Sequence, residues 1–203
     1  MSTCYRNIIV TGASGFVGRR VIAEMLRSNI NANIYALVRK PTFFDSNIRE
    51  ITITDINDTE WIKNFNEKID CIIHIAGAAH NKMDKNEPDP LDYFRRVNTL
   101  ATKTIANEAA EKGAKRFIFI SSIGVLGTTT NEPFSDETPE NPISDYAISK
   151  YEAELEIKKA CESRNSNMEF VIIRPPLVYG PGPPGNFLQL LKITRSGMPL
   201  PFL

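Results

Sequence analysis

A glycine-rich stretch near the N-terminus, TGASGFVG at residues 11–18, constrains the fold of this chain more than any other feature. An apolar run at residues 7–10 precedes it, and an amphipathic run at residues 16–26 follows it. This succession predicts a strand, a tight loop and a helix. We therefore expect the chain to open with a strand–loop–helix unit.

Three glycines of this stretch, Gly12, Gly15 and Gly18, lie three residues apart. Glycine allows a tight turn and a close approach of a pyrophosphate, and the following helix offers free N–H groups and the positive end of its dipole. Arg19 and Arg20 fall in the first helical turn, where cations oppose the dipole unless an anion is bound nearby. A plain tight turn with a solvated basic face is the alternative, but the flanking strand and helix favour dinucleotide binding.

Apolar runs that predict strands alternate with segments that predict helices along the rest of the chain. The further predicted strands are 33–38, 51–54, 70–75, 117–120 and 170–173, and the further predicted helices are 59–68, 91–112, 145–164 and 186–195. Continuous apolar strands that alternate with helices are typical of a parallel sheet buried on both faces. The sequence thus predicts an α/β fold, a Rossmann-like doubly wound parallel sheet flanked by helices.

Composition and cysteine usage exclude several classes of protein. The 24 basic and 24 acidic residues cancel, so no basic field favours nucleic acid, and no apolar run is long enough to span a membrane. Cys4, Cys71 and Cys161 are scattered and lack metal-ligand spacing. Cys71 and His74 lie in an apolar run and are expected to be core residues. We expect a metal-free, cytoplasmic protein whose polar N-terminus is not a signal peptide.

One group of residues suggests acid–base chemistry. Tyr146 and Lys150 are four residues apart on a predicted helix and so share a face. An ammonium beside a phenol lowers the phenol pKa from about 10, which gives a general acid–base near neutral pH. Ser122 follows a predicted strand, where its hydroxyl could polarise a substrate oxygen. Such a Tyr/Lys spacing alone is usually a surface pair, but it follows a glycine loop and a strand-end serine here.

The end of the second predicted strand bears on the choice of cofactor. An acid there would bind the free ribose hydroxyl of NAD, whereas a basic residue suits the 2′-phosphate of NADP. Arg39 and Lys40 occupy this position, and no acid follows before Asp45. NADP is therefore favoured and NAD remains possible, while two solvated charges at a strand end are the competing interpretation.

Motifs along the whole chain carry a resemblance to a known family. The matching stretches are TGASGFVG, DI at 55–56, HIAGAA from His74, VN at 97–98, SSIGVLG from Ser121, YAISK from Tyr146 and RPPLVYGPG from Arg174. In this order they resemble the extended short-chain dehydrogenase/reductase family, the NAD(P)-dependent epimerases and dehydratases. The last part, through GMPLPF, is most similar to bacterial UDP-N-acetylhexosamine 4-epimerases and related 4-ketoreductases.

The resemblance implies roles for individual residues. The catalytic residues would be Ser122, rather than its neighbour Ser121, with Tyr146 and Lys150. The cofactor would contact Gly12, Ser14, Gly15, Phe16, Val17, Gly18, Asp55, Ile56, Ala76, Gly77, Ala78, Asn98, Lys150, Pro175, Pro176 and Val178, together with Arg39 and Lys40. The substrate would contact Ser122, Tyr146, Asn186, Phe187, Pro199 and Phe202.

The second predicted strand lacks the acid of NAD-bound epimerases, and three further features bear on the resemblance. Sugar 4,6-dehydratases place an Asp-Glu pair after the catalytic hydroxyl, where Ile123 and Gly124 stand here, so dehydration is not expected. Leu126 replaces a frequent tyrosine, which puts one substrate contact in doubt. Family members also carry about 100 further residues, enough for a lobe of their own. We expect a truncated chain, with an NAD(P)-binding domain at 1–180 and the beginning of a substrate lobe at 181–203.

The function implied is that of a nucleotide-sugar epimerase or 4-ketoreductase acting on a UDP-linked sugar. A reductase of a non-nucleotide ketone and a non-catalytic NADP-binding protein are the alternatives. The family also implies a homodimer through helices 91–112 and 145–164. Apolar positions beyond one face of these helices include Leu100, Ile105, Leu155 and Ile157.

Overall fold

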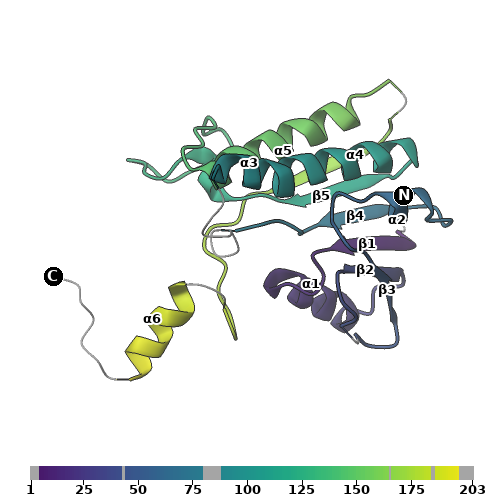
Figure 1. The fold of residues 1–203 in the computed structure, drawn as a ribbon, viewed down its shortest axis with the longest axis horizontal. Coiled ribbons are helices and arrows are strands. Elements are labelled where there is room, and N and C mark those ends of the chain that lie inside the picture. The colour runs from purple at the N-terminus through teal and green to yellow at the C-terminus, as the bar shows by residue number, and fades with distance from the viewer. Residues whose placement is uncertain (1–4, 43, 80–87, 165, 184–185, 197–203) are drawn as a thin grey trace.

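A single parallel sheet organises the computed structural model, which describes residues 5–42, 44–79, 88–164, 166–183 and 186–196 (Figure 1). Its strands are β1 (Asn7–Thr11), β2 (Asn33–Val38), β3 (Ile48–Thr52), β4 (Cys71–His74), β5 (Arg116–Ile120) and β6 (Glu169–Ile173). They pair in the order β3-β2-β1-β4-β5-β6, and every pair is parallel. The order reverses between β1 and β4, the point at which ligands bind in such sheets.

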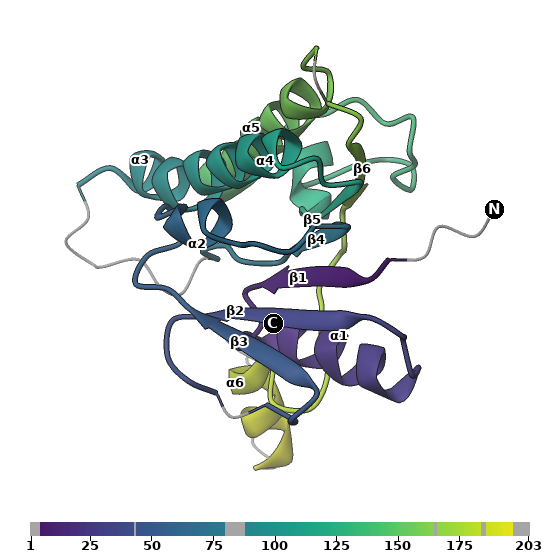
Figure 2. The same cartoon turned by 90° about the vertical axis from the view of Figure 1, so that its right-hand side faces the viewer.

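Helices cover both faces of this sheet. The α-helices of the described residues are α1 (Phe16–Arg27), α2 (Glu60–Lys63), α3 (Pro90–Phe94), α4 (Ala101–Glu111), α5 (Asp145–Cys161) and α6 (Asn186–Arg195). Figure 2 shows α1 on one side of the sheet and α4 and α5 on the other. The chain after β6 leads away from these layers to α6 (Figure 1). The Rossmann-like, doubly wound prediction is therefore confirmed. Within the described residues, no helix has both the length and the apolar character needed to cross a membrane.

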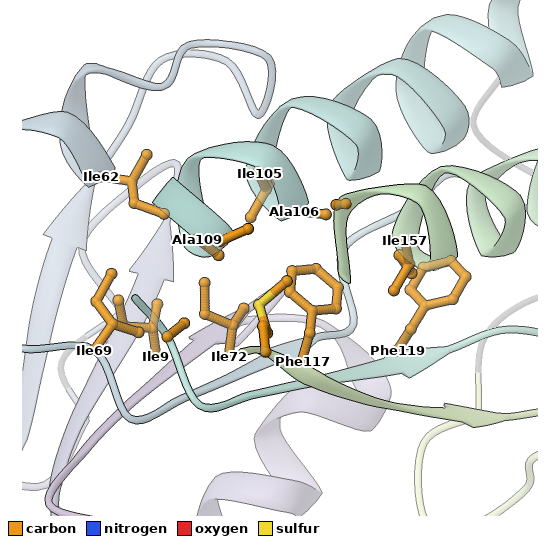
Figure 3. Close-up of a cluster of buried hydrophobic side chains, with 14 of the residues drawn as sticks. Ile9, Ile62, Ile69, Ile72, Ile105, Ala106, Ala109, Phe117, Phe119 and Ile157 are labelled. Carbon is orange, nitrogen blue, oxygen red and sulfur yellow. The ribbon is translucent and has the colours of Figure 1, made fainter. Parts of the chain in front are cut away.

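Strand alternation builds two cores, because successive side chains of a strand point to opposite faces. In β1, Ile8 and Val10 pack in the cluster beneath α1, whereas Ile9 joins the cluster beneath α4 and α5. The second cluster includes Ile72, Phe117, Phe119, Ile105 and Ile157 (Figure 3). The two cores fix the sheet whose carboxyl edge carries the site.

Three predicted elements differ from the structure. The predicted helix 91–112 is divided into α3, a π-helix at Arg95–Leu100 and α4, because Asn98 in the π-helix bonds to a neighbouring loop. The predicted strand 51–54 lies earlier, at β3, because pairing with β2 buries Ile48 opposite Ile34. The predicted helix 59–68 is limited to α2, which ends in a turn where the Phe65 N–H bonds the Ile62 carbonyl.

Of the four apolar positions expected at a dimer interface, two are buried in the core and two are accessible. Ile105 and Ile157 are completely buried in the core, so that part of the prediction is wrong. Leu100 is 49% exposed, and Leu155 is half-buried. Only the last two are accessible to another subunit.

Candidate active site

The glycine loop packs against the end of β4. Gly12 has a φ of +66°, and a Cβ added there would lie 2.6 Å from the backbone nitrogen of Ala76. A Cβ on Gly18 would lie 2.2 Å from the Gly12 carbonyl oxygen. Both positions therefore require glycine. Gly15 begins α1 without a side-chain cap, which leaves first-turn N–H groups available to a phosphate.

A hollow of about 510 Å³ opens at this helix start. Its lining consists of Ser14, Gly15, Phe16, Arg19, Arg20, Pro181 and Gly182. The Arg19 Nε donates to the Ser14 carbonyl at 2.9 Å, which holds that guanidinium at the loop. The structure thus brings the glycine loop, two arginines and the segment after β6 to one place. A phosphate there would find both backbone donors and positive charge.

The π-helix connects the β4 edge to α5 through Asn98. The Ala78 N–H donates to Asn98 Oδ1 at 2.8 Å, and Asn98 Nδ2 donates to the Ala78 carbonyl at 3.2 Å and to Ser149 Oγ at 3.0 Å. Gly77 lies between, where a Cβ would be 3.0 Å from Asn98 Oδ1 and 3.9 Å from Lys150 Nζ. The Asn98 side chain therefore holds the Ala76–Ala78 backbone near Lys150. Sequence reasoning missed Ser149.

His74 and Cys71 are core residues, as the sequence predicts. The His74 ring lies 2.7 Å from Thr11 Oγ1 and 3.0 Å from Thr102 Oγ1, so both ring nitrogens have partners. Burial lowers the pKa of His74 to about 3, which keeps the ring neutral. Burial raises the pKa of the Cys71 thiol to about 11. Neither side chain is poised for chemistry near neutral pH.

The Ser122 hydroxyl and the Tyr146 phenol lie near each other at the carboxyl edge of the sheet, where Ser122 acts to lower the pKa of the phenol. The Ser122 hydroxyl also accepts from the Gly124 N–H at 3.2 Å, which caps an unpredicted 3₁₀ helix at Ile123–Leu126. Burial raises the pKa of the Tyr146 phenol, and this effect outweighs the opposite effect of Ser122. The expectation that Lys150 lowers this pKa is therefore not met in this state, because burial dominates.

Lys150 lies one helical turn after Tyr146 and is only 3% exposed. Its ammonium is 3.9 Å from the centroid of the Phe119 ring, a favourable cation–π position. Burial lowers the pKa of Lys150 to about 7, while the Glu154 carboxylate acts to raise it. Near neutral pH, Lys150 can therefore hold or release a proton. Glu154, one turn further along α5, was also missed by sequence reasoning.

Four further predicted cofactor residues follow β2 and β3. Arg39 and Lys40 are exposed at the end of β2. The pKa of Asp55 is lowered mainly by hydrogen bonds from Asn57 and further by the charge of Arg39, which places Arg39 and Asp55 in the same neighbourhood. Ile56 is half-buried against the core.

Residues after β6 approach the centre from the opposite side. The Ile123 N–H donates to the Pro175 carbonyl at 3.0 Å, which ties this segment to Ser122. Pro176 and Val178 are exposed beyond it. Of the predicted substrate residues, Asn186 and Phe187 begin α6, whereas Pro199 and Phe202 lie outside the described residues.

Comparison with known proteins agrees with this arrangement. Residues 8–195 match the NAD dependent epimerase/dehydratase family. The chain is 38% identical over 200 residues to a UDP-glucose 4-epimerase of Vibrio cholerae, covering 97% of this chain and 59% of that protein. It is 27% identical over 191 residues to the N-acetyl-alpha-D-glucosaminyl-diphospho-ditrans,octacis-undecaprenol 4-epimerase of Escherichia coli O157:H7, covering 94% of this chain and 54% of that protein.

A solved structure of MoeE5 in complex with UDP-glucose and NAD has the same fold. It aligns with a TM-score of 0.81 at 26% identity, covering 96% of this chain and 62% of that chain. The chain therefore spans less than two thirds of the length of each of these relatives.

Proposed function

The chain belongs to the NAD dependent epimerase/dehydratase family, and on that basis we propose that it forms the cofactor-binding and catalytic part of a UDP-sugar 4-epimerase or 4-ketoreductase. One observation carries the proposal: Ser122, Tyr146 and Lys150 lie together at the carboxyl edge of the sheet. The UDP-glucose 4-epimerase of Vibrio cholerae and the UDP-glucose and NAD bound to MoeE5 support the substrate class. Residues 181–203 would begin the substrate lobe.

The residues present fit a nicotinamide dinucleotide. Gly12 and Gly18 leave no room for a Cβ, and the hollow beside them combines helix-start N–H groups with Arg19. The pyrophosphate would lie there, the adenosine toward Asp55, and the nicotinamide ribose near Lys150. When bound, the nicotinamide would supply the hydride acceptor or donor for the reacting sugar carbon.

Side chains of the protein would transfer the proton of the reacting sugar hydroxyl and bind its oxygen. Tyr146, in its phenolate form, would take the proton of the reacting sugar hydroxyl and give it back, and the Ser122 hydroxyl would donate to the developing carbonyl oxygen. Lys150 would stabilise the phenolate once it forms. Ile123 and Gly124 follow Ser122 without a carboxylate, so the site lacks the acid that dehydration would need at this position.

The test is the Tyr146→Phe variant of the full-length protein. We expect kcat to fall at least about 100-fold, because general acid–base catalysis is lost, while cofactor binding is retained. Tyr151→Phe, on the same helix, is the matched control and should keep its turnover. Near-normal turnover by Tyr146→Phe would remove this residue from the mechanism. Turnover of simple ketones but of no UDP-sugar would favour a ketone reductase, and no turnover by the parent would favour a binding protein.

We also propose that NADP binds more tightly than NAD. Support comes from Arg39 and Lys40, two exposed cations at the end of β2, where the adenosine ribose lies in this fold. The NAD in MoeE5 makes NAD the alternative. Retained NAD would favour the epimerase, which returns the hydride to its own substrate, whereas NADP suits a ketoreductase that exchanges its cofactor.

A homodimer through the outward faces of α4 and α5 is a further proposal. Leu100 is 49% exposed at the start of α4 and offers an apolar contact. Leu100→Glu should shift the protein to monomer in sedimentation experiments, because a charge would be buried at the interface. Leu177→Glu, 67% exposed elsewhere, is the control. A monomeric parent at high concentration would contradict the proposal.

A further inference from the structure

We propose that Glu154 is a positioning residue that holds together the segments carrying Ser122, Lys150 and Pro175 and keeps Lys150 charged during the reaction. The part of the inference that concerns turnover rests on the proposed function. The part that concerns the charge of Lys150 does not, and it is measured separately below.

Glu154 is fully buried and receives hydrogen bonds from two elements. The Ser121 hydroxyl donates to its Oε1 at 2.5 Å. Arg174, directly after β6, donates from Nε to Oε1 at 3.0 Å and from Nη2 to Oε2 at 2.6 Å. The same Nη2 donates to Glu140 at 2.8 Å. One carboxylate on α5 therefore anchors the ends of both β5 and β6.

These anchors are direct neighbours of the proposed reacting groups. Ser121 precedes Ser122, and its N–H donates to the Ile173 carbonyl at 2.7 Å. Arg174 precedes Pro175, whose carbonyl accepts from the Ile123 N–H at 3.0 Å. A shift of either anchor would move the serine hydroxyl or the segment next to the nicotinamide. Each residue that Glu154 binds, Ser121 or Arg174, is therefore the direct sequence neighbour of a residue proposed to contact the substrate or the cofactor.

The groups around Lys150 give Glu154 an electrostatic role as well. Tyr146 faces Lys150 from the same helix, the neutral His74 from β4 and the Phe119 ring from β5. The Asn98 amide lies near its ammonium from the π-helix. Among these, the carboxylate of Glu154 brings the negative charge that favours the ammonium, although Arg174 offsets part of it.

Stability alone does not account for this arrangement. Replacing a buried ion pair by well-packed apolar residues is often neutral or stabilising, because desolvation offsets the Coulomb attraction. A charged residue at a fully buried position one turn from Lys150 therefore points to a role in placing and charging that lysine.

The first experiment titrates Lys150 in this chain by NMR of its ε-methylene group, assigned with Lys150→Arg. Glu154→Gln should lower the Lys150 pKa by about one unit or more, because the ammonium loses its partner charge. Glu156→Gln is the matched control on the same helix, where the carboxylate pairs with Lys103 and Lys159, and it should leave the titration unchanged. An unchanged Lys150 pKa in a folded Glu154→Gln variant would overturn the electrostatic role.

The second experiment measures kcat against pH in the full-length enzyme. For a one-unit drop in pKa, the charged fraction of Lys150 falls about tenfold at pH values well above the original pKa and hardly changes at pH values well below the lowered pKa. Glu154→Gln should therefore show a kcat deficit that grows with pH to about tenfold, at nearly constant KM. A deficit of equal size at every pH would indicate a structural role only and contradict the proposal.

Glu154→Asp keeps the charge but shortens the reach to Ser121 and Arg174. We expect a Lys150 pKa close to that of the parent but a lower kcat, since the anchors are displaced. Should Glu154→Gln not fold, this variant decides the matter, because an unchanged kcat would overturn the positioning role. A parent without turnover of UDP-sugars would refute the proposed function and leave the titration of Lys150 as the test.

Discussion

The carboxyl edge of the sheet has a buried centre and an exposed rim. In the centre, His74, Asn98, Lys150 and Glu154 are nearly inaccessible, and hydrogen bonds or ring contacts fix their positions. The rim consists of Arg39–Lys40 after β2 and residues 177–182 after β6, where Leu177 is 67% exposed. The residues proposed to transfer protons lie in the centre, whereas those proposed to recognise ligands lie at the rim.

The difference has a physical basis. Buried polar groups are costly unless each has a partner, so the centre is cross-linked and its pKa values are shifted. Exposed residues have no such requirement, and their charges act through solvent. Substitutions in the centre should therefore change stability and pH dependence, while substitutions at the rim should change ligand preference.

The largest expected effect concerns acid stability and His74. Its pKa is about 3 in the fold and about 6.5 when unfolded. Between pH 6.5 and 3, His74 is protonated in the unfolded chain but not in the folded chain. The stability that is present above pH 6.5 is therefore lost as the pH falls toward 3. The slope is about 1.4 kcal/mol per pH unit, and the loss over this interval is about 5 kcal/mol.

His74→Gln should remove this component of the acid sensitivity while the carboxylates titrate as before. Urea unfolding followed by the fluorescence of Trp61, the single tryptophan, measures both proteins at several pH values. If the two curves run parallel between pH 6.5 and 4, the buried neutral histidine is not a source of acid sensitivity.

Gly12, packed beside the centre, and Gly182, at the rim, allow a direct comparison of the two regions. Gly12 and Gly182 have similar φ values, +66° and +70°, but Gly12 meets Ala76 backbone whereas Gly182 has no heavy atom within 4 Å. Alanine at either position costs roughly 1–2 kcal/mol for the left-handed backbone. At Gly12 the clash adds about 1–3 kcal/mol.

We therefore expect Gly12→Ala to lower the free energy of unfolding by about 2–5 kcal/mol and to abolish measurable cofactor binding, since the loop is displaced. Gly182→Ala should cost about 1 kcal/mol and leave the glycine loop in place, so the affinity should fall much less than in Gly12→Ala. Chemical denaturation and nucleotide titration of both variants measure this. Equal losses would show that the surroundings of the two glycines do not differ in energy.

The sequence predicts which reactive residues lie in the centre, but it does not predict the hydrogen bonds that join them to distant parts of the chain. The apolar strands, the glycine loop and the Tyr146/Lys150 spacing are local patterns, and the parallel sheet follows from them. The contacts of Asn98 with Ala78, and of Glu154 with Ser121, join residues 20 and 33 positions apart. No periodicity encodes such contacts, so the π-helix and the Glu154 cluster were not predicted.

Tertiary packing also overrides local expectation in the helices and in the phenol. Ile105 and Ile157 are apolar positions whose helices approach the sheet from the same side, so both are buried in the core rather than offered to a partner. Burial raises the pKa of Tyr146, and the four-residue spacing of Tyr146 and Lys150 contains no information about burial. The sequence spacing thus identifies the residues of the proposed site, whereas their burial in the fold determines their pKa values.

The smallest expected effect lies at the rim, in the preference for NADP. A guanidinium can bind a phosphate with two parallel hydrogen bonds, and Lys40 adds a point charge. A charge-assisted contact is worth about 1.5–3 kcal/mol, or roughly 10- to 150-fold in affinity. Arg39→Ala should narrow the gap between NADP and NAD by up to this factor and leave the NAD affinity almost unchanged.

Arg20→Ala is a useful second variant, because Arg20 is one of the residues that line the hollow beside the glycine loop. It should weaken NAD and NADP equally, since both share the pyrophosphate, whereas Arg39→Ala acts on NADP alone. Added salt should reduce the NADP preference, because exposed charges are screened beyond about 10 Å at 0.1 M ionic strength. Equal titration curves for the two nucleotides, or tighter binding of NAD, would contradict the NADP assignment. That result would place Arg39 with Asp55 rather than with a ligand phosphate and would favour an epimerase that retains NAD.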